Sequence, residues 1–589
     1  MLDRPKPILP LDERLAETIA ASSIERTAHS RHDAIVVGAG AAGGMAAALL
    51  CEAGMRVLCL DATNRTSVRA APLTRLSNAL VRVLSDPATR RRLPPTQVRM
   101  LEDTLTGLGR RRQPIQSHSD IWALLPDAFI DDVANPYMAE PANPIFYWLR
   151  AQLLGGRMAL PGHHLQYYRM SPRDFQKSAA NPDGWPIRYS DLTPWYDLVE
   201  KRIGLAGLND AAGDIPQSTI RQVTPTSAGE TALMTAIRKK WPDAAVMMGQ
   251  HAKPANLLGE AAATGYLLCR TGAVVQRVEV DGRGAVRGVH WFDIETGRME
   301  KTSAPIVFLC ASALESTRIL MMSGDGGVGA KSGVLGRYLM DHITQKAEGI
   351  GPRLPQPADP PDAGRCIYLP QFQKRRPDEG AKQSSFNIQV RQSPAWGGQS
   401  WFSALLTAEM PADRSNRMVL DPDRTDPYGA PLMKIHCQRG HAQFIAAAER
   451  ANALRELADA VGAELHHVDD MPLAPGLAAA ECGTARMGAD PQDSVLDPNS
   501  QCWEAKGLYV TDGAGMVSQG RVGPALTIMA LTARACAHAL QVSPQETRPK
   551  ERARERMEKA AQSRRRRAAK SAKPVDKART RRPVKAQSE

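Results

Sequence analysis

Short apolar segments near residue 40 predict a strand, a helix and a second strand in close succession. Residues 33–37 read Asp-Ala-Ile-Val-Val, and a short continuous apolar run is typical of a strand that is covered on both faces. Small apolar residues dominate positions 41–53, which predicts a helix that ends at Gly54. Residues 56–60 read Arg-Val-Leu-Cys-Leu, which predicts a second strand that ends at Asp61.

The second half of the chain carries comparable patterns. Residues 507–514 predict a strand that ends in an acid and a glycine, and residues 523–535 predict an apolar helix with a proline in its first turn. Apolar residues at helical spacing from His441 to Val461 predict an amphipathic helix that Gly462 closes. Its inward-facing residues are expected to be Phe444, Ile445, Ala448, Leu454, Leu457 and Val461.

Composition places the chain among globular proteins. It has 589 residues, of which 43% are hydrophobic and 23% charged, enough for several domains or for one large fold with insertions. The nine cysteines are odd in number and widely spaced, and no CxxC occurs. This pattern argues against a disulfide framework and against a cysteine-rich metal site, so no metal site is predicted.

The net charge of +13 belongs to the C-terminal end of the chain. Residues 548–589 hold 17 Lys and Arg but only five Asp and Glu, so the rest of the chain is almost neutral. A nucleic-acid-binding body is therefore not favoured. Residues 542–589 lack the apolar residues that a core needs and are expected to be a disordered basic tail. The tail is either simply solvated or loosely attracted to anionic surfaces, without specific nucleic-acid recognition.

The first 31 residues carry no apolar segment of the kind that a secretory signal requires, and no stretch of about 20 uncharged apolar residues occurs in the chain. Leu11, Leu15 and Ile19 are spaced four apart and suit one short helix. We therefore expect no membrane span and a cytoplasmic protein.

A glycine-rich turn joins the first predicted strand to its helix. Gly38, Gly40 and Gly43 form GxGxxG, and Asp61 ends the next strand, which is the arrangement of a dinucleotide site. The first glycine permits the tight turn and the second lets backbone N–H groups approach a pyrophosphate. The third lets helix and strand pack closely. Asp61 would accept hydrogen bonds from the adenosine ribose. The motif alone does not choose between NAD and FAD.

Further motifs resemble the glucose–methanol–choline (GMC) family of FAD oxidoreductases. Within that family, the pattern is most similar to bacterial gluconate or glucoside dehydrogenase flavoprotein subunits and to pyranose oxidase. The resemblance covers residues 31–63 and 125–541. The motifs that carry it are residues 150–157, 183–196, 304–323, 336–342, Gly483-Thr484-Ala485-Arg486-Met487-Gly488 and Gly523-Pro524-Ala525-Leu526-Thr527.

The resemblance implies FAD as the cofactor. In the family, the helix that begins near Pro524 points at the flavin, where negative charge collects on reduction. Asp512 and Gly513 would follow the ribityl and phosphate part, and the backbone of Val275 would meet the adenine. Leu160 stands where some relatives carry a histidine that tethers FAD, so non-covalent FAD is expected. The full predicted cofactor set is Gly38, Gly40, Ala42, Gly43, Asp61, Gly155, Gly156, Val275, Asp512, Gly513, Pro524 and Ala525.

The sequence departs from the family at the two catalytic positions. The family's proton-accepting histidine corresponds to Ala480, and its second His or Asn corresponds to Gly523; neither side chain can accept a proton. Three accounts stay open. Another residue supplies the base, the substrate needs no strong base, or the protein binds FAD without oxidising alcohols. Candidates for another base are Glu481, Arg521, His163 and His164.

These patterns predict an α/β protein with an FAD-binding Rossmann-like domain built from discontinuous segments and a substrate domain with an antiparallel sheet. Within the substrate domain, residues 416–421 resemble a strand of an antiparallel sheet. The predicted boundaries are 1–30 for a leader, 31–180, 255–345 and 475–541 for the FAD-binding segments, 181–254 and 346–474 for the substrate domain, and 542–589 for the tail.

The predicted function is oxidation of a CH–OH group of a sugar or other alcohol by hydride transfer to FAD. The alternative is a flavin-binding partner subunit or pseudoenzyme. Expected partners are a small-molecule alcohol or sugar and an electron-acceptor protein or small subunit.

Overall fold

The structure is a computed structural model. It describes residues 32–63, 93–94, 97–98, 100–101, 103–104, 113–119, 122, 128–140, 145–160, 166–178, 181–208, 213–252, 255–353, 365–375, 385–394 and 400–541. The predicted leader, the predicted basic tail, and His163 and His164 lie outside the described residues. Within the part of the chain that is described, no helix combines the length and the apolar character needed to cross a membrane.

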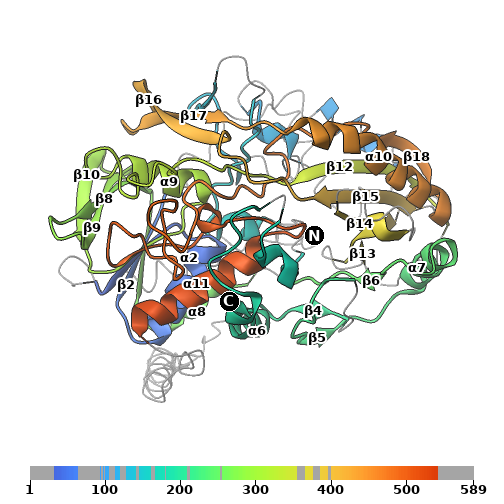
Figure 1. Ribbon diagram of the computed structural model, residues 1–589, viewed down its shortest axis with the longest axis horizontal. Helices are drawn as coiled ribbons and strands as arrows, with labels where there is room; N and C mark the ends of the chain where they lie inside the picture. Colours follow the sequence, from blue (N-terminus) through green and yellow to red (C-terminus); the bar gives the residue numbers. More distant parts are fainter. Residues whose placement is uncertain are drawn as a thin grey trace, which may run out of the picture.

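A five-stranded parallel sheet forms the first half of the molecule (Figure 1). Its order is β19 (Leu508–Val510), β11 (Val307–Leu309), β1 (Ala34–Val37), β2 (Val57–Asp61) and β7 (Leu267–Thr271). All four pairings are parallel. The strands are short, apolar and largely buried because helices and other elements cover both faces of a parallel sheet.

Helices complete this half. They are α2 (Ala41–Glu52), α6 (Tyr189–Ile203), α8 (Leu257–Ala263), α9 (Ala313–Met321) and α11 (Ala525–Leu540). Helix α11 packs against α2 and α6, and α2 packs against α8. An antiparallel sheet of β8 (Ala273–Val280), β9 (Val286–Asp293) and β10 (Arg298–Ser303) lies beside it, with β8 against β2 and α9. The predicted strand–helix–strand unit around Gly38 is confirmed.

A six-stranded antiparallel sheet forms the second half, beside the first in Figure 1. Its order is β18 (Glu464–Val468), β12 (Ile343–Gly351), β15 (Ser400–Ala408), β14 (Phe386–Pro394), β13 (Ile367–Leu369) and β6 (Met247–Met248). Helix α10 (His441–Val461) packs on β12, β15 and β18, and α7 (Ala228–Lys240) packs against α10. The predicted α/β fold class with an antiparallel sheet in a second part of the molecule is confirmed.

The bounds of α10 match the prediction, and Gly462 closes it in the left-handed conformation. The prediction of its inner face was partly wrong. Leu454, Leu457 and Val461 are buried, but Phe444 and Ile445 are 43% and 68% exposed and Ala448 is also exposed. Ala447, one residue away, is buried instead, so helical spacing at the start of α10 does not correspond to burial.

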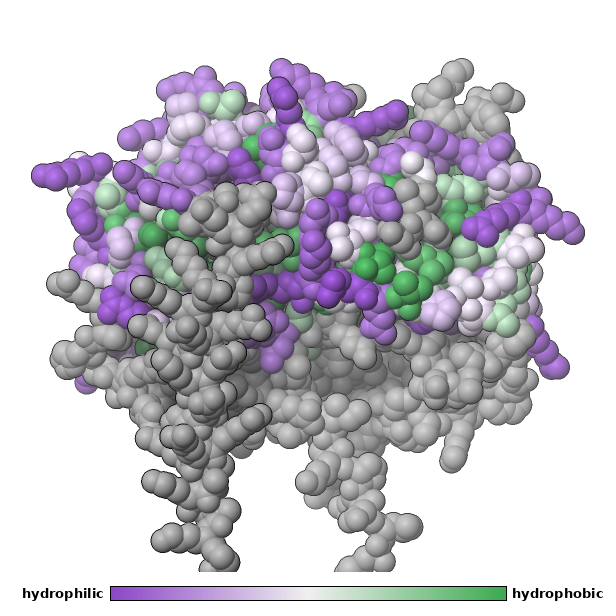
Figure 2. All heavy atoms as spheres, turned by 90° about the horizontal axis from the view of Figure 1, so that it is seen from below, coloured by the Kyte–Doolittle hydropathy of each residue, from purple (hydrophilic) through white to green (hydrophobic). Residues whose placement is uncertain are grey.

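Two small sheets complete the architecture. Strands β16 (Arg417–Thr425) and β17 (Pro431–His436) are antiparallel, and β3 (Met138–Ala139) joins β17 in parallel. Strands β4 (Ala206–Gly207) and β5 (Gln222–Val223) pair in parallel. The predicted strand at 416–421 corresponds to β16, which pairs antiparallel with β17. Hydrophilic side chains cover much of the described surface seen from below, and apolar residues gather in smaller areas between them (Figure 2).

Two main hydrophobic cores correspond to the two halves. The first contains the parallel sheet and also Trp195 and Tyr196 of α6. The second lies against the six-stranded sheet and includes Tyr137 and Phe146. The boundary between the cores therefore does not coincide with the predicted boundary at residue 181, because α6 packs with the parallel-sheet half. All nine cysteines are among the described residues, and each is a buried free thiol.

Candidate active site

A cavity of 1420 Å³ lies between the two halves of the molecule. Loops that follow β1, β2, β11 and β19 line one side, and strands β12, β14 and β15 line the other. The carboxyl ends of parallel strands are where α/β sheets bind ligands. The volume exceeds the roughly 300–1,000 Å³ of an ordinary small-molecule pocket. The cavity can therefore hold a dinucleotide and a second small molecule.

The glycines of the turn after β1 are required by close backbone contacts. Gly38 has φ +92°, and a Cβ there would lie 2.5 Å from the carbonyl oxygen of Cys310. A Cβ on Gly43 would lie 1.8 Å from the carbonyl oxygen of Gly38. Gly40 is different, because the one described atom that a Cβ there would approach is the Cα of Gly156, at 4.0 Å. The chain itself therefore has no need of a glycine at position 40, whereas a ligand that approaches this backbone would.

The backbones of Gly40 and Gly156 are in contact in the cavity wall. A Cβ on Gly156, which has φ +63°, would lie 3.0 Å from the Cα of Gly40. Both residues line the cavity, as does Ala42. Helix α2 begins here with no side-chain cap and no acidic residue in its first turn. We call this arrangement of Gly40, Gly156 and the start of α2 the glycine cradle. Its backbone N–H groups suit an anion.

The predicted ribose-binding Asp61 lines the cavity at the end of β2. Its carboxylate accepts hydrogen bonds from the backbone N–H groups of Ala39, at 2.7 Å, and Thr63, at 2.8 Å. The acid thus holds the glycine-rich turn and the end of β2 together. Val275, on β8, lies on the same side of the cavity.

The C-terminal motif lines the middle of the cavity. Asp512 accepts hydrogen bonds from the hydroxyl of Ser316, at 2.5 Å, and from the N–H of Ala514, at 2.9 Å. Burial raises the pKa of Asp512 to about 6, while the Ser316 hydrogen bond lowers it. Asp512 and Gly513 both line the cavity, as do Pro524 and Ala525 at the start of α11.

Helix α11 presents a second uncapped amino end to the cavity. Pro524 provides no side-chain cap, and the first turn holds no acidic residue. Backbone N–H groups at such an end favour negative charge. Of the predicted cofactor set, the structure brings ten residues to the cavity wall. Gly43 and Gly155 instead shape the turns behind the wall.

The structure brings together the two positions at which the family carries its catalytic residues. Ala480 and Gly523 both line the cavity, and the side chain of Gln519 donates a hydrogen bond to the carbonyl oxygen of Ala480. The loops that carry positions 480 and 523 are therefore in direct contact. Neither position places a polar side chain in the cavity.

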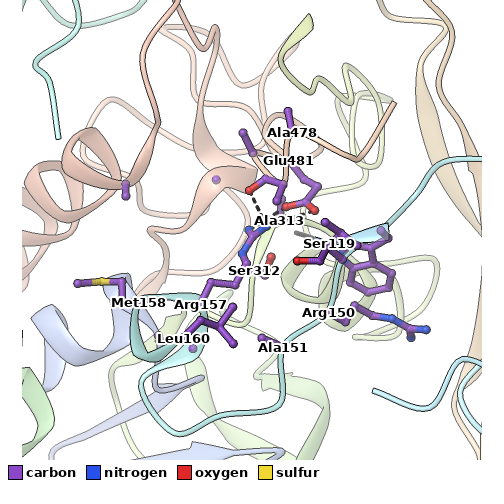
Figure 3. Close-up of a pocket in the computed structure, with 18 of the residues that line it drawn as sticks. Ser119, Arg150, Ala151, Arg157, Met158, Leu160, Ser312, Ala313, Ala478 and Glu481 are labelled. Carbon is purple, nitrogen blue, oxygen red and sulfur yellow. Dashed lines mark hydrogen bonds and ion pairs between the residues drawn. The ribbon is translucent and has the colours of Figure 1, made fainter. Parts of the chain in front are cut away.

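Glu481 is committed to an ion pair. Its carboxylate lies 2.8 Å from Nη2 of Arg157, and Nη1 of Arg157 also donates to the carbonyl oxygen of Ala479 (Figure 3). Burial raises the pKa of Glu481, whereas Arg157 opposes that rise. The side chain of Glu481 is 0% exposed, while that of Arg157 is 30% exposed. The pair fixes the cavity wall and leaves the carboxylate poorly placed to accept a substrate proton.

Arg521 is also held in place. Its guanidinium forms an ion pair with Asp214 and donates a hydrogen bond to Ser385, at 2.6 Å. Burial lowers the pKa of Arg521, but Asp214 and Asp174 outweigh that effect and the pKa is raised. Arg521 therefore stays a cation and does not accept a proton.

Sequence reasoning missed the polar face of the six-stranded sheet. Three cross-strand rows lie against the cavity: Thr344, Thr407 and Asn387; Lys346, Leu405 and Gln389; and Glu348, Ser403 and Arg391. Eight of these nine side chains are polar. Alternating polar positions in 342–348 and 387–391 were the available signal, since one face of a strand repeats every second residue. We call these nine residues the polar grid.

Similarities to known proteins agree with this geometry. Residues 411–532 match the family model described as GMC oxidoreductase, and residues 36–83 match the model of an NAD(P)-binding Rossmann-like domain. This chain carries a GMC oxidoreductase domain. The resemblance noted from the motifs is thereby confirmed for residues 411–532. The Rossmann-like match extends into residues that the structure does not describe.

Several characterised relatives are similar over part of the chain. A 2-methyl-1,2-propanediol dehydrogenase of Mycolicibacterium austroafricanum is 25% identical over 65% of this chain and 79% of its own length. A C-glycoside 3-oxidase of Microbacterium trichothecenolyticum is 30% identical over 45% of this chain and 52% of its own. The fructose dehydrogenase large subunit of Gluconobacter japonicus is 25% identical over 45% of this chain and 52% of its own length.

A solved structure shares the fold. Pyridoxine 4-oxidase from "Mesorbium loti" superposes with a TM-score of 0.54 over 87% of this chain and 100% of that one, at 19% identity. At that identity the likeness concerns the fold alone.

Proposed function

We propose that this protein is an FAD-dependent oxidoreductase that oxidises a CH–OH group of a polyhydroxylated small molecule, such as a sugar. One observation carries the proposal: a single cavity combines the glycine cradle, two uncapped helix ends and the polar grid.

The cradle fits a dinucleotide cofactor. A pyrophosphate that lies against Gly40 and Gly156 would meet the amino end of α2, and no acidic side chain lies in the first turn of α2 to repel it. The amino end of α11, at Pro524, would favour the negative charge of a reduced flavin. Bound FAD would supply a two-electron acceptor for a hydride. Leu160 at the tethering position supports non-covalent binding.

The polar grid supports a polyhydroxylated substrate. Its amide and hydroxyl side chains can each donate and accept hydrogen bonds, as sugar hydroxyls do. Asn387 is already held by the Tyr368 hydroxyl, at 2.6 Å, and by the carbonyl oxygen of Arg521, at 3.0 Å, so it presents a fixed orientation. Trp401 lines the same face and offers an apolar surface to a sugar ring. Relatives named for a diol, a C-glycoside and fructose support the same substrate class.

A second candidate function is a flavin-binding subunit that does not oxidise alcohols. Ala480 and Gly523 favour it, because a positioned general base typically contributes about 10²–10⁴ in rate. One relative is named as a large subunit, which supports a partner protein that would accept electrons or act as a small subunit. The polar grid argues for the enzyme, since a subunit with no substrate needs no cavity lined by hydrogen-bonding side chains.

Anaerobic flavin reduction separates the two candidates. The full-length chain, loaded with FAD, is mixed under nitrogen with aldoses, ketoses, glycosides and simple alcohols, and the visible flavin absorption is followed. An enzyme loses this absorption with one sugar class and yields an equal amount of carbonyl product. Gln389→Leu should raise the sugar concentration needed for half-maximal reduction about tenfold or more. Gln438→Leu, at an exposed residue outside the cavity wall, is the control. A flavin that no compound reduces would favour the subunit.

A further inference from the structure

His342 lies at the junction of the two halves of the cavity. It immediately precedes β12, and residues 342, 344, 346 and 348 all line the cavity. This period of two is that of one face of a strand. His342 therefore extends the line of cavity-facing residues that β12 contributes to the polar grid, at the end nearest the loop that carries position 480. Of the histidines that the structure describes, only His118 and His342 line the cavity.

The backbone around His342 is tied to the loop that carries position 480. The carboxylate of Asp341 accepts hydrogen bonds from the N–H groups of Gly476, at 2.7 Å, and Ala480, at 3.1 Å. Met340 pairs with Cys482 through two backbone hydrogen bonds. His342 is thereby fixed next to the position where the family carries its proton acceptor.

The imidazole is tied to the loop that carries position 523. It interacts with the backbone at Gly520 and Gln519, and Gln519 in turn contacts the carbonyl oxygen of Ala480. The ring nitrogen Nε2 is buried and has no hydrogen-bond partner among the described residues. Buried polar atoms are nearly always hydrogen-bonded, so a buried and unpaired Nε2 on a residue of the cavity wall points to a ligand that completes the bond.

We propose that Nε2 of His342 accepts the hydroxyl proton of the substrate, in place of the side chains that are absent at positions 480 and 523. This inference rests on the proposed alcohol oxidation. The O–H bond of the substrate breaks, and its proton passes to Nε2. The electron pair left on oxygen forms the second C–O bond. The C–H bond breaks, and its hydrogen would pass with both electrons, as a hydride, to bound FAD, the two-electron acceptor. The alcohol becomes a carbonyl, and the histidine becomes an imidazolium.

The surroundings of His342 agree with this role. Burial lowers the pKa of His342 to about 4, so the ring is neutral near pH 7 and Nε2 carries a lone pair. The charged and titratable groups on neighbouring elements are Glu481 and Arg521 in the cavity wall, Asp341, and Glu409, which accepts a hydrogen bond from the N–H of Gly520 at 3.2 Å. Glu481 and Arg521 are already ion-paired. His342 is left as the neutral base.

The test uses His342→Asn in the FAD-loaded full chain. Asparagine can keep the interaction with the backbone at residues 519 and 520 but has no atom at the place of Nε2. The rate of anaerobic flavin reduction by the best sugar should fall about 10²–10⁴-fold, while the FAD dissociation constant stays within threefold. Added imidazole should restore at least a tenth of the lost rate. His436→Gln, on β17 and outside the cavity wall, is the control.

Each outcome decides the proposal. A His342→Asn rate within threefold of the natural protein overturns it, as does a slow variant that imidazole does not rescue. His342→Gln serves as the second variant. If both variants lose FAD affinity in parallel with rate, the residue is structural and the proposal fails. A natural protein whose flavin no sugar or alcohol reduces would instead overturn the proposed function itself, which keeps the two failures distinct.

Discussion

Gly40→Ala isolates the contribution of the glycine cradle to FAD binding. Gly40 has φ −72°, which alanine adopts freely, and its added Cβ would lie 4.0 Å from the nearest atom, the Cα of Gly156. The stability of the apoprotein should therefore change by no more than about 0.5 kcal/mol. A bound pyrophosphate would meet the new methyl group directly. We expect FAD to bind at least about tenfold more weakly, which corresponds to about 1.4 kcal/mol.

Gly43→Ala and Gly204→Ala are the matched controls. A Cβ on Gly43 would lie 1.8 Å from the carbonyl oxygen of Gly38, so that variant should lower the melting temperature of the apoprotein itself. Gly204 has φ +65° and no atom within 4 Å of an added Cβ, so it reports backbone strain alone, about 1–2 kcal/mol. FAD affinity is measured by flavin fluorescence titration. Unchanged affinity in Gly40→Ala would refute the cradle as the pyrophosphate site.

Three further predictions concern the cavity wall. Arg157→Met should lower the free energy of unfolding more than Glu481→Gln, by about 1–3 kcal/mol, because it leaves the fully buried Glu481 unpaired; equal losses in urea unfolding would contradict this. The stability of the apoprotein should fall as pH rises from about 4 through 6, since the folded-state pKa of Asp512 is raised above its usual 3.8. Asp512→Asn should remove about 3 kcal/mol of that fall, and an unchanged pH slope would exclude the effect. Ala480→His with Gly523→Asn, made in the His342→Asn background, should restore flavin reduction at least tenfold; stopped-flow rates with no gain would show that the two positions no longer face the substrate.

The local elements were the most predictable part of the fold. The strand before Gly38, the helix after it and the helix from His441 to Val461 are fixed by short-range patterns of apolar residues and by glycines that end helices. The exposure of Phe444 and Ile445 was not predictable. Helical spacing shows which residues share a face, but it does not show which turns of that face other elements cover.

The parts of the candidate site that depend on backbone geometry could be predicted from the sequence. The parts that depend on contacts between distant side chains could not. Gly38, Gly40 and Asp512 follow from motif spacing, and the structure brings all three to the cavity. His342 was part of a quoted motif, yet its role depends on contacts with residues 519 and 520, nearly 180 positions away. Predicting the polar grid would have required the register of β12, β15 and β14, which the sequence does not show. Sequence alternation alone shows that a strand has a polar face, but not that this face lines a cavity.

The visible flavin spectrum of the FAD-loaded chain, recorded under nitrogen before and after addition of a sugar panel, tests the central claim most directly. We predict a yellow protein whose flavin absorption is lost with one class of polyhydroxylated substrate, with one carbonyl product formed for each flavin reduced. A chain that binds no FAD would contradict the dinucleotide site. A chain that binds FAD but keeps its absorption with every sugar and alcohol would contradict the proposed oxidation.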